Sequence, residues 1–548
     1  MNTPIYNKLK ELDSEKRIPF HMPGHKRTDF GAFFGIEKMD ITEITDYDNL
    51  HEPEGIIRES MDLVKDIFKS TESWYLVGGS TLGILVSISS VCKPGDKILI
   101  GRNCHKSVYN CIRLLQLEAV YCYADISQKY DVCVDMKPEM VEKKLKENPE
   151  IKAVVLTSPT YEGVVSDIKG IKKTIQPYGI PLIVDEAHGA HFVFDKYFPD
   201  SATKQGADLV IQSTHKTLPS LTQTAVLHLC SDLIKKEQVE EMIDIYETSS
   251  PSYLLMASAE YGIMYMKEEK EQLAQYVDNL KIFRKKCEQL QKIELLDQKK
   301  LGCFAYDNGK LVFSVKNCGI NGKELFHLLY DKYHIELEME NLTYGIAMTS
   351  VCDTKENFEK LWAAISEIDK MCDFREKQNE LEKKTQPESL IGENFVTKNL
   401  EFVYPPKMME SWQCRGRQVE NIKLSDAVGR ISGKYVMIYP PGVPILVPGE
   451  KILKEGLPNM EFDMKDNKVH GNAGCNIFNS TVVLDDQDIS SITINPAATT
   501  MMACPDMETE DAILKAMGDV KGVKAGQSEN EMLLVDANGN VLMVLSKN

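Results

Sequence analysis

The stretch LVIQSTHKT at residues 209–217 decides the fold prediction, because an apolar run ends there in Ser-Thr-His-Lys. A similar stretch, LIVDEAHGAH at 182–191, is an apolar run that ends in an acid. Short apolar runs bounded by polar residues are typical of strands buried on both faces. The two stretches therefore predict strands whose carboxyl ends carry Lys216 and Asp185, and such strand ends are where open α/β sheets bind ligands.

The same pattern continues between residues 51 and 270. Apolar runs of strand length alternate there with segments long enough for crossover helices, and the further runs are KILI at 97–100, AVYCY at 119–123, AVVLT at 153–157 and AVLHL at 225–229. This alternation predicts an α/β fold with a mostly parallel sheet that helices cover on both faces.

The 548-residue chain is long enough for several domains. We expect an N-terminal arm, a large domain, a small α+β domain, a linker or exposed helix, a further compact block, and a small β-rich domain; their residues are 1–50, 51–270, 271–372, 373–392, 393–454 and 455–548. The last segment has 15 acidic and 6 basic residues, so it carries half of the net charge of −18.

Composition excludes several classes of protein. Hydrophobic residues make up 43% and charged residues 27%, which is typical of a globular chain. No run of about 18 apolar residues and no secretion signal is present, so we expect a cytoplasmic protein that does not enter a membrane. The negative charge argues against nucleic-acid binding. The 14 cysteines include no Cys-x-x-Cys pair, so we expect no metal site.

Two further stretches place polar groups at predicted helix starts. VGGSTLG at 77–83 follows an apolar run, and its Gly79, Ser80 and Thr81 suit a phosphate because a helix start offers free N–H groups and hydroxyl donors. The ordinary alternative is a turn followed by a helix cap. The stretch NCHKS at 103–107 places His105 in a similar position.

Together these groups match the needs of pyridoxal 5′-phosphate. A cup holds the phosphate, a lysine binds the aldehyde, an acid keeps the pyridinium protonated and a flat histidine stacks on the ring. Taken singly, Asp185 is equally a helix-capping aspartate and Lys216 a solvated loop lysine. The combination is what favours the cofactor.

The sequence also resembles a known family. Like the stretches above, three further motifs resemble the Orn/Lys/Arg decarboxylases of the aspartate-aminotransferase fold, in their short form. The motifs are HMPGHK at 21–26, SPTYEG at 158–163 and GRISGKYVMIYPPGVPILVPGE at 429–450. The resemblance covers residues 1–453. It implies PLP fold type I, pyridoxal 5′-phosphate as cofactor, decarboxylation of arginine, lysine or ornithine to a polyamine or its precursor, and a homodimer or higher homo-oligomer.

The resemblance also assigns roles to residues. It makes Lys216 the Schiff-base lysine, Asp185 the acid at the pyridinium nitrogen and His105 the stacking ring. The other cofactor contacts that it implies are Gly79, Ser80, Thr81, Ala187, His188, Ser213 and His215. Residues 248–250, Thr-Ser-Ser, are expected to reach the phosphate of a neighbouring subunit.

Glu338 matches the glutamate that holds the distal cation of the substrate. Glu336 and Glu340 flank it with a period of two, so a shifted alignment or a solvent-facing strand are alternatives. Residues 332–374 contain no arginine, whereas fold relatives that transaminate clamp the substrate carboxylate with one. The remaining alternatives are another pyridoxal reaction, of the aminotransferase or aldolase type, and an inactive scaffold that binds partners through its tail.

The tail resembles a second family. GNAGCNIFN at 471–479, PAATTMMACPD at 496–506 and LLVDANGNVLMVL at 533–545 are similar to the META domain, a small β-rich module. Cys475 and Cys504 fall in two of these motifs, and in a cytosolic chain we expect a free pair rather than a disulfide.

Overall fold

A computed structural model describes residues 1–11, 23, 26, 35–385, 404–423, 426–438, 442–453, 459–463, 468–472, 477–485, 488–495, 498–499, 507–525 and 531–546. The chain divides into two compact units, of which the first comprises Met1–Glu382, Met409–Arg417 and Lys434–Pro448 and the second the remaining residues. Most of the HMPGHK motif, the prolines at 440–441, Cys475 and Cys504 lie outside the described residues.

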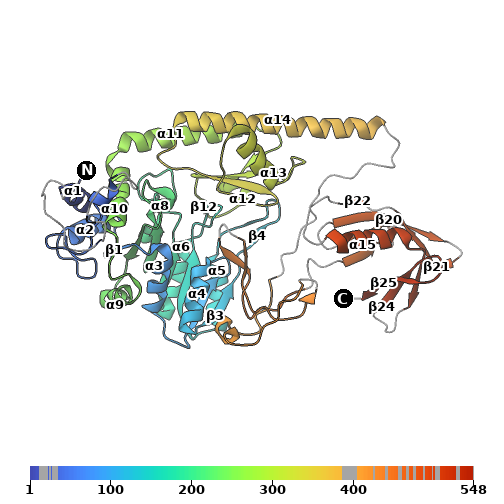
Figure 1. The fold of residues 1–548 in the computed structure, drawn as a ribbon, viewed down its shortest axis with the longest axis horizontal. Coiled ribbons are helices and arrows are strands. Elements are labelled where there is room, and N and C mark those ends of the chain that lie inside the picture. Colours follow the sequence, from blue (N-terminus) through green and yellow to red (C-terminus); the bar gives the residue numbers. More distant parts are fainter. Residues whose placement is uncertain are drawn as a thin grey trace. The chain divides into compact units, whose positions relative to one another are not determined.

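A seven-stranded sheet forms the centre of the first unit (Figure 1). The strand order is β1-β10-β9-β8-β6-β2-β3, and the pairs from β9 to β3 are parallel whereas β10 is antiparallel to both of its neighbours. The strands are β1 Glu72–Leu76, β2 Lys97–Gly101, β3 Glu118–Cys122, β6 Ile151–Thr157, β8 Leu182–Asp185, β9 Leu209–Ser213 and β10 Ala225–Leu229. The predicted strands are therefore present. The sheet also contains β1, which was not among the strands predicted from the sequence.

Helices cover both faces of this sheet. Alternate strand residues enter different cores, as Ile183 and Ile211 join one and Val184 and Val210 the other. The helices of the first face are α1 Pro4–Glu11, α2 Ile56–Phe68, α3 Gly79–Ser89, α4 Lys106–Leu115, α9 Lys236–Tyr246 and α10 Tyr253–Glu268. Those of the second are α5 Pro138–Glu147, α6 Ile168–Ile175 and α7 Ala202–Gln205, while the short α8 Thr214–Thr217 continues directly from β9.

A smaller antiparallel sheet follows, in the order β11-β13-β15-β14. Its strands are β11 Glu294–Leu295, β13 Lys310–Ser314, β14 Met339–Glu340 and β15 Tyr344–Met348, and its helices are α11 Lys270–Cys287, α12 Gln298–Leu301, α13 Gly322–His327 and α14 Lys355–Thr385. The pair of β7 (Val164–Val165) and β12 (Ala305–Tyr306) joins this region to the chain between β6 and β8. The start of β13 is thereby held beside the loop that follows β6.

Two short segments from far along the sequence also pack on the first unit. Trp412 donates its indole N–H to the carbonyl of Leu117 at 3.1 Å. Arg102 donates to the carbonyls of Pro444 and Ile445, at 2.6 and 3.1 Å, beside the hairpin of β16 (Val436–Ile438) and β17 (Val443–Leu446). This hairpin belongs to the predicted compact block, and it contacts the large sheet through Arg102, the residue that follows β2.

The second unit contains an antiparallel sheet in the order β18-β19-β20-β21-β23-β24-β25, with β22 paired to β20. The strands are β18 Asn459–Asp463, β19 Lys468–Asn472, β20 Ile477–Asp485, β21 Asp488–Ile494, β22 Ala498–Thr499, β23 Gly522–Ala525, β24 Glu531–Val535 and β25 Val541–Ser546. Helix α15 (Met507–Asp519) packs Met517 into its core. The sequence predicted that this region is β-rich, but it did not predict the helix.

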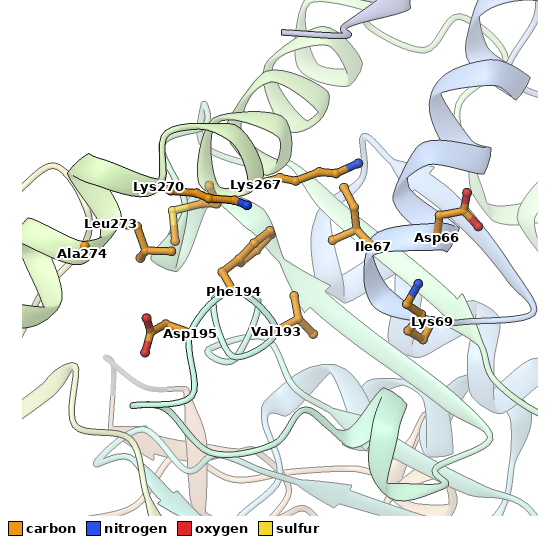
Figure 2. Close-up of a pocket in the computed structure, with 11 residues that line it drawn as sticks. Asp66, Ile67, Lys69, Val193, Phe194, Asp195, Lys267, Lys270, Leu273 and Ala274 are labelled. Atoms are coloured by element: carbon orange, nitrogen blue, oxygen red, sulfur yellow. The ribbon is translucent and has the colours of Figure 1, made fainter.

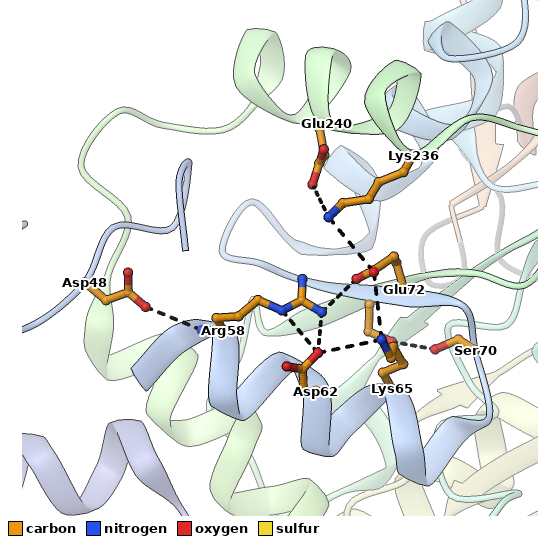
Figure 3. A network of polar contacts seen from close by, with 9 residues as sticks. Asp48, Arg58, Asp62, Lys65, Ser70, Glu72, Lys236 and Glu240 are labelled. Atoms are coloured by element: carbon orange, nitrogen blue, oxygen red, sulfur yellow. Dashed lines mark hydrogen bonds and ion pairs between the residues drawn. The ribbon is translucent and has the colours of Figure 1, made fainter. Parts of the chain in front are cut away.

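A network of charged side chains ties α2 to β1 and α9 (Figure 3). Arg58 donates to Asp62 on the next helical turn and to Glu72 at 2.9 Å, and these bonds raise the pKa of Arg58 and lower that of Asp62. Lys236 bridges Glu72 and Glu240 at 4.0 and 3.2 Å. The network holds the strand that leads into residues 77–83. Among the described residues, no helix is both long and apolar enough for a membrane span.

The close packing of α3 on the sheet rests on Gly83, and we predict that Gly83→Ala destabilises the protein. A Cβ at this position meets side-chain atoms of Ile211 and Leu76 at 2.8 Å. Overpacking of this kind costs about 1–3 kcal/mol, which outweighs the ~1 kcal/mol that alanine gains in helix propensity. Thermal unfolding should therefore show a lower Tm.

The matched control is Ser87→Ala on the same buried helix. The Ser87 hydroxyl is buried and has no hydrogen-bond partner among the described residues, so its removal should leave the Tm unchanged or higher. An unchanged Tm for Gly83→Ala would contradict the prediction, because it would show that the space between α3 and the sheet admits a methyl group.

Candidate active site

Lys216 and Asp185 lie at the carboxyl ends of two adjacent parallel strands. Asp185 ends β8, paired with Ile211 of β9, and Lys216 lies on α8 directly after β9. Asp185 is 5% exposed, and burial raises its pKa while the charge of Lys216 opposes that rise. Burial likewise lowers the pKa of Lys216, opposed by Asp185 and Glu338. The two groups therefore lie in one desolvated site and stabilise each other's charge.

The residues of the predicted phosphate cup lie at the start of α3. Gly79 is the first residue of the helix and has a φ of +72°, a conformation that favours glycine. Ser213, at the end of β9, donates its hydroxyl to the Ser80 hydroxyl oxygen at 3.0 Å, while Thr81 is exposed. The cup and the lysine strand are thus in direct contact.

Two side chains that the sequence did not single out form hydrogen bonds with the backbone just before the start of α3. Glu247 accepts hydrogen bonds from the backbone N–H of Val77 at 3.0 Å and of Gly78 at 3.4 Å. Gln223 donates to the carbonyl of Val77 at 2.7 Å. They fix the turn that precedes the helix start. The three residues after Glu247, at 248–250, are exposed, as a contact with another subunit requires.

The two predicted histidines beside the cup are held by backbone groups. His105 caps α4, and its Nδ1 accepts from the backbone N–H of Ser107 at 3.2 Å. Burial, with the charges of Lys216 and Lys106, lowers the pKa of His105 to about 4, so its ring is neutral near pH 7. His215 donates from Nδ1 to the carbonyl of Thr224 at 2.9 Å. A neutral, fixed imidazole suits stacking on an aromatic ring.

His188 occupies the centre of the site, between two lysines. It is 6% exposed, its Nε2 lies 3.2 Å from Nζ of Lys216, and its Nδ1 lies 2.7 Å from Nζ of Lys310. Lys310 begins β13 of the small sheet and was missed by the sequence analysis, because a lysine at a strand start carries no local signal. Ala187, one residue earlier, donates its N–H to Asp185 at 3.1 Å.

Glu338 lies at the edge of the site. Its side chain is exposed, as the solvent-facing alternative predicted, yet it accepts a hydrogen bond from the hydroxyl of Tyr161. Its charge also opposes the burial that lowers the pKa values of Lys216 and Lys310. A second carboxylate, Glu162, accepts from Tyr344 at 2.9 Å. Two tyrosine-bonded carboxylates therefore flank the lysines, and SPTYEG, which contains Tyr161 and Glu162, is the sequence signal for them.

A separate surface pocket of about 520 Å³ lies away from these residues (Figure 2). It is formed by α2, the loop at 193–195 and the junction of α10 and α11, and its charged lining residues are Asp66, Lys69, Asp195, Lys267 and Lys270. None of the predicted site residues lines it. The chemistry-bearing groups therefore gather at the strand ends and not in this pocket.

Comparison with known families agrees with this geometry. Residues 3–318 match the Orn/Lys/Arg decarboxylase major domain, and residues 390–464 match the C-terminal domain of the same family. The arginine decarboxylase of Bacillus subtilis (strain 168) is 32% identical over 468 residues, which cover 83% of this chain and 92% of the relative. That of Bacillus anthracis is 31% identical over 475 residues, covering 85% and 93%. The chain belongs to the Orn/Lys/Arg decarboxylase family, as predicted.

Solved structures show the same fold. The lysine decarboxylase of Francisella novicida superposes with a TM-score of 0.69 at 21% identity, covering 83% of this chain and 75% of that one. The constitutive lysine decarboxylase of Escherichia coli gives 0.66 at 19% identity, covering 83% and 76%. The predicted α/β architecture of PLP fold type I is confirmed. Residues 444–548 match the META domain, which confirms the second resemblance.

The geometry of the cup predicts that Gly79→Ala weakens the binding of inorganic phosphate. A residue with a Cβ is strained at this φ by about 1–2 kcal/mol, and the strain is relieved by tilting the N–H groups of the helix start. We expect the dissociation constant for phosphate to rise about tenfold, a change of ~1.4 kcal/mol. The phosphate-dependent rise in Tm measures it.

Gly95→Ala is the matched control. Gly95 has a similar φ of +88° in a turn where an added Cβ meets nothing within 4 Å. Both variants should lose similar stability, but only Gly79→Ala should lose phosphate affinity. Equal phosphate affinity in the two variants would remove the helix start from the role.

Proposed function

We propose that this protein is a pyridoxal 5′-phosphate-dependent decarboxylase of a basic amino acid: arginine, lysine or ornithine. The observation that carries the proposal is that Asp185 and Lys216 lie at adjacent strand ends, close to the start of α3, where a helix offers N–H groups to an anion. Membership of the Orn/Lys/Arg decarboxylase family supports it. The cytoplasm is the proposed location.

The residues present fit this cofactor. Asp185 is a buried carboxylate in hydrogen-bond contact with a backbone N–H, which leaves it able to pair with a cationic ring nitrogen. Lys216 is an amine whose pKa is lowered by burial, so it is a better nucleophile for an aldehyde than a solvated lysine. Ser80 and Ser213 bring hydroxyl donors to the helix start, where a phosphate group would lie.

When bound, pyridoxal 5′-phosphate supplies a sink for the electron pair that CO2 leaves behind at Cα. The chain's own residues do the rest. Asp185 would keep a proton on the ring nitrogen, His105 would stack on the ring, and Lys216 would hold the aldehyde end of the cofactor. Buried, water-poor surroundings strengthen each of these interactions.

The distal end of the substrate is proposed to meet Glu338. Its carboxylate is oriented by Tyr161, and Glu162, oriented by Tyr344, adds a second negative charge nearby. A side chain that ends in a cation several methylenes from Cα suits this pair. Each methylene discriminates by only ~1–3 kcal/mol, so the geometry selects the class of basic amino acids rather than one member.

The hydrogen bonds of Arg284 favour decarboxylation over transamination. Arg284, on α11 of the small domain, donates to the backbone carbonyls of Asn308, Leu296 and Lys310 at 2.8–3.1 Å. Its guanidinium is therefore committed to backbone groups and does not serve as a clamp for the substrate carboxylate. We further propose a homodimer or higher homo-oligomer, in which the exposed residues 248–250 approach the phosphate of the neighbouring subunit.

The proposal predicts that the purified chain, supplied with cofactor, releases CO2 from at least one of arginine, lysine and ornithine. Lys216→Ala should reduce CO2 release to background, because the amine that holds the cofactor is lost. Lys204→Ala, which removes an exposed lysine of α7, should retain full activity. Release from none of the three amino acids by the unaltered protein would overturn the proposed function.

The role of Glu338 predicts a split between KM and kcat. Glu338→Gln should raise KM for the basic substrate about tenfold, since a hydrogen bond to a charged group contributes about 1.5–3 kcal/mol, and should leave cofactor binding unchanged. Glu336→Gln, at a neighbouring exposed position, is the control and should leave KM unchanged. Equal KM values for the two variants would place the distal-cation site elsewhere.

A further inference from the structure

His188 joins two lysines through opposite sides of one ring. Its Nδ1 lies 2.7 Å from Nζ of Lys310 and its Nε2 lies 3.2 Å from Nζ of Lys216. Lys310 is 1% exposed and His188 6%, so the contact between these two residues is shielded from water, whereas Lys216 is half-buried. The role that the family resemblance gives to Lys216 does not explain why Lys310, a buried lysine of the small sheet, also reaches the site.

The position of Lys310 is built into the backbone around it. A Cβ on Gly163 would lie 2.8 Å from Cγ and 2.9 Å from Cβ of Lys310, so the lysine stem packs directly on a glycine. The backbone N–H of Lys310 donates to the carbonyl of Asp307 at 3.0 Å, and its own carbonyl accepts from Arg284 at 2.8 Å. The lysine therefore enters the site along a defined path.

The hydrogen-bonding capacity of the three groups restricts where protons lie. A neutral imidazole has one N–H donor and one acceptor nitrogen, and an ammonium group has donors only. Burial and the charges of Lys310 and Lys216 lower the pKa of His188 well below its usual value, so the ring is neutral. Its acceptor nitrogen satisfies one ammonium, and its N–H then needs a neutral amine as partner. The bridge therefore suits a state in which one of the two lysines is charged.

Other charged groups surround the bridge on every side. Asp185 and Glu338 face Lys216, whereas Asp307, Glu162 and Glu338 face Lys310. His215 and His191 act on His188, and His191 is bonded to Asp307 at 3.1 Å. Burial, partly offset by these carboxylates, lowers the pKa of Lys310 to about 8. Lys310 is thus able to take up and release a proton near neutral pH, and burial also lowers the pKa of Lys216.

We propose that Lys310 and His188 form a proton relay that supplies Lys216. This inference rests on the proposed function, because decarboxylation consumes one proton per turnover: the bond from Cα to the carboxylate breaks, CO2 leaves, and a C–H bond forms at Cα with the electron pair left behind. Lys310 acts through His188 and is a positioning and proton-supplying residue rather than one that touches substrate.

The transfer is balanced within the three groups. The Lys310 ammonium gives a proton to Nδ1 of His188, and the N–H at Nε2 passes to the Lys216 amine, which becomes an ammonium group. The imidazole remains neutral and changes only its tautomer. Lys216 then gives its proton to Cα. Before the next turnover the ring returns to its first tautomer, and Lys310 takes up a proton from solvent on the side of the exposed Glu338.

Competitive labelling with acetic anhydride tests the relay on the full-length chain prepared without cofactor. Mass spectrometry of the Lys216 peptide, as a function of pH, gives the pKa of Lys216. In Lys310→Met the competing charge is gone and His188 is free to accept from the Lys216 ammonium, so the pKa of Lys216 should rise by about one unit or more. Labelling at pH 8 should fall about tenfold.

Two further variants keep this test decisive. Lys316→Met removes a lysine paired with Asp131 on the same stretch of chain and should leave the titration of Lys216 unchanged. Lys216→Met should raise the pKa of Lys310 by the same amount, since coupling between two sites is reciprocal. If the partner lysine titrates unchanged in both Lys310→Met and Lys216→Met, the two lysines do not share a proton and the relay is wrong.

A second readout uses the protein loaded with cofactor. Lys310→Met should release CO2 at a near-normal rate in the first turnover, while steady-state turnover falls at least about tenfold because resupply of the proton is slow. An equal loss in both phases would contradict the relay and assign Lys310 to structure. Absence of CO2 release by the unaltered protein would overturn the proposed function instead, and the labelling result would still decide whether the lysines are coupled.

Discussion

Two opposite charges at neighbouring strand ends, Asp185 and Lys216, require the surrounding sheet and helices to hold them in place. Asp185 is buried and Lys216 is half-buried, and each stabilises the charged form of the other. Parallel strands in register, covered on both faces by apolar helices, are what keep this pair in place and dry.

Close backbone approach is the second requirement, and glycine meets it at three positions. Gly83 allows α3 to pack against the sheet, Gly79 turns the chain into the helix start, and Gly163 lets the stem of Lys310 enter from the small sheet. The small sheet thereby contributes directly to a site whose other groups come from the large one. The chemistry of the site is thus built from two sheets that are far apart in the sequence.

Sequence reasoning predicted the parts of this arrangement that local pattern encodes. Apolar runs gave the strands of the large sheet, and because parallel strand ends meet at one edge, they also predicted that Asp185 and Lys216 approach each other. The contact between Lys310 and His188 was beyond reach, since it joins residues 122 positions apart and depends on the pairing of β7 with β12. The same holds for Tyr161, whose role depends on where Glu338 lies.

Trapping of the cofactor on the chain tests the central claim most directly. The full-length protein is incubated with pyridoxal 5′-phosphate, reduced with borohydride and mapped by mass spectrometry of its peptides. The account predicts one modified residue, Lys216, and a loss of that modification in Gly79→Ala at low cofactor concentration. Modification of a different lysine, with Lys216 left free, would contradict it.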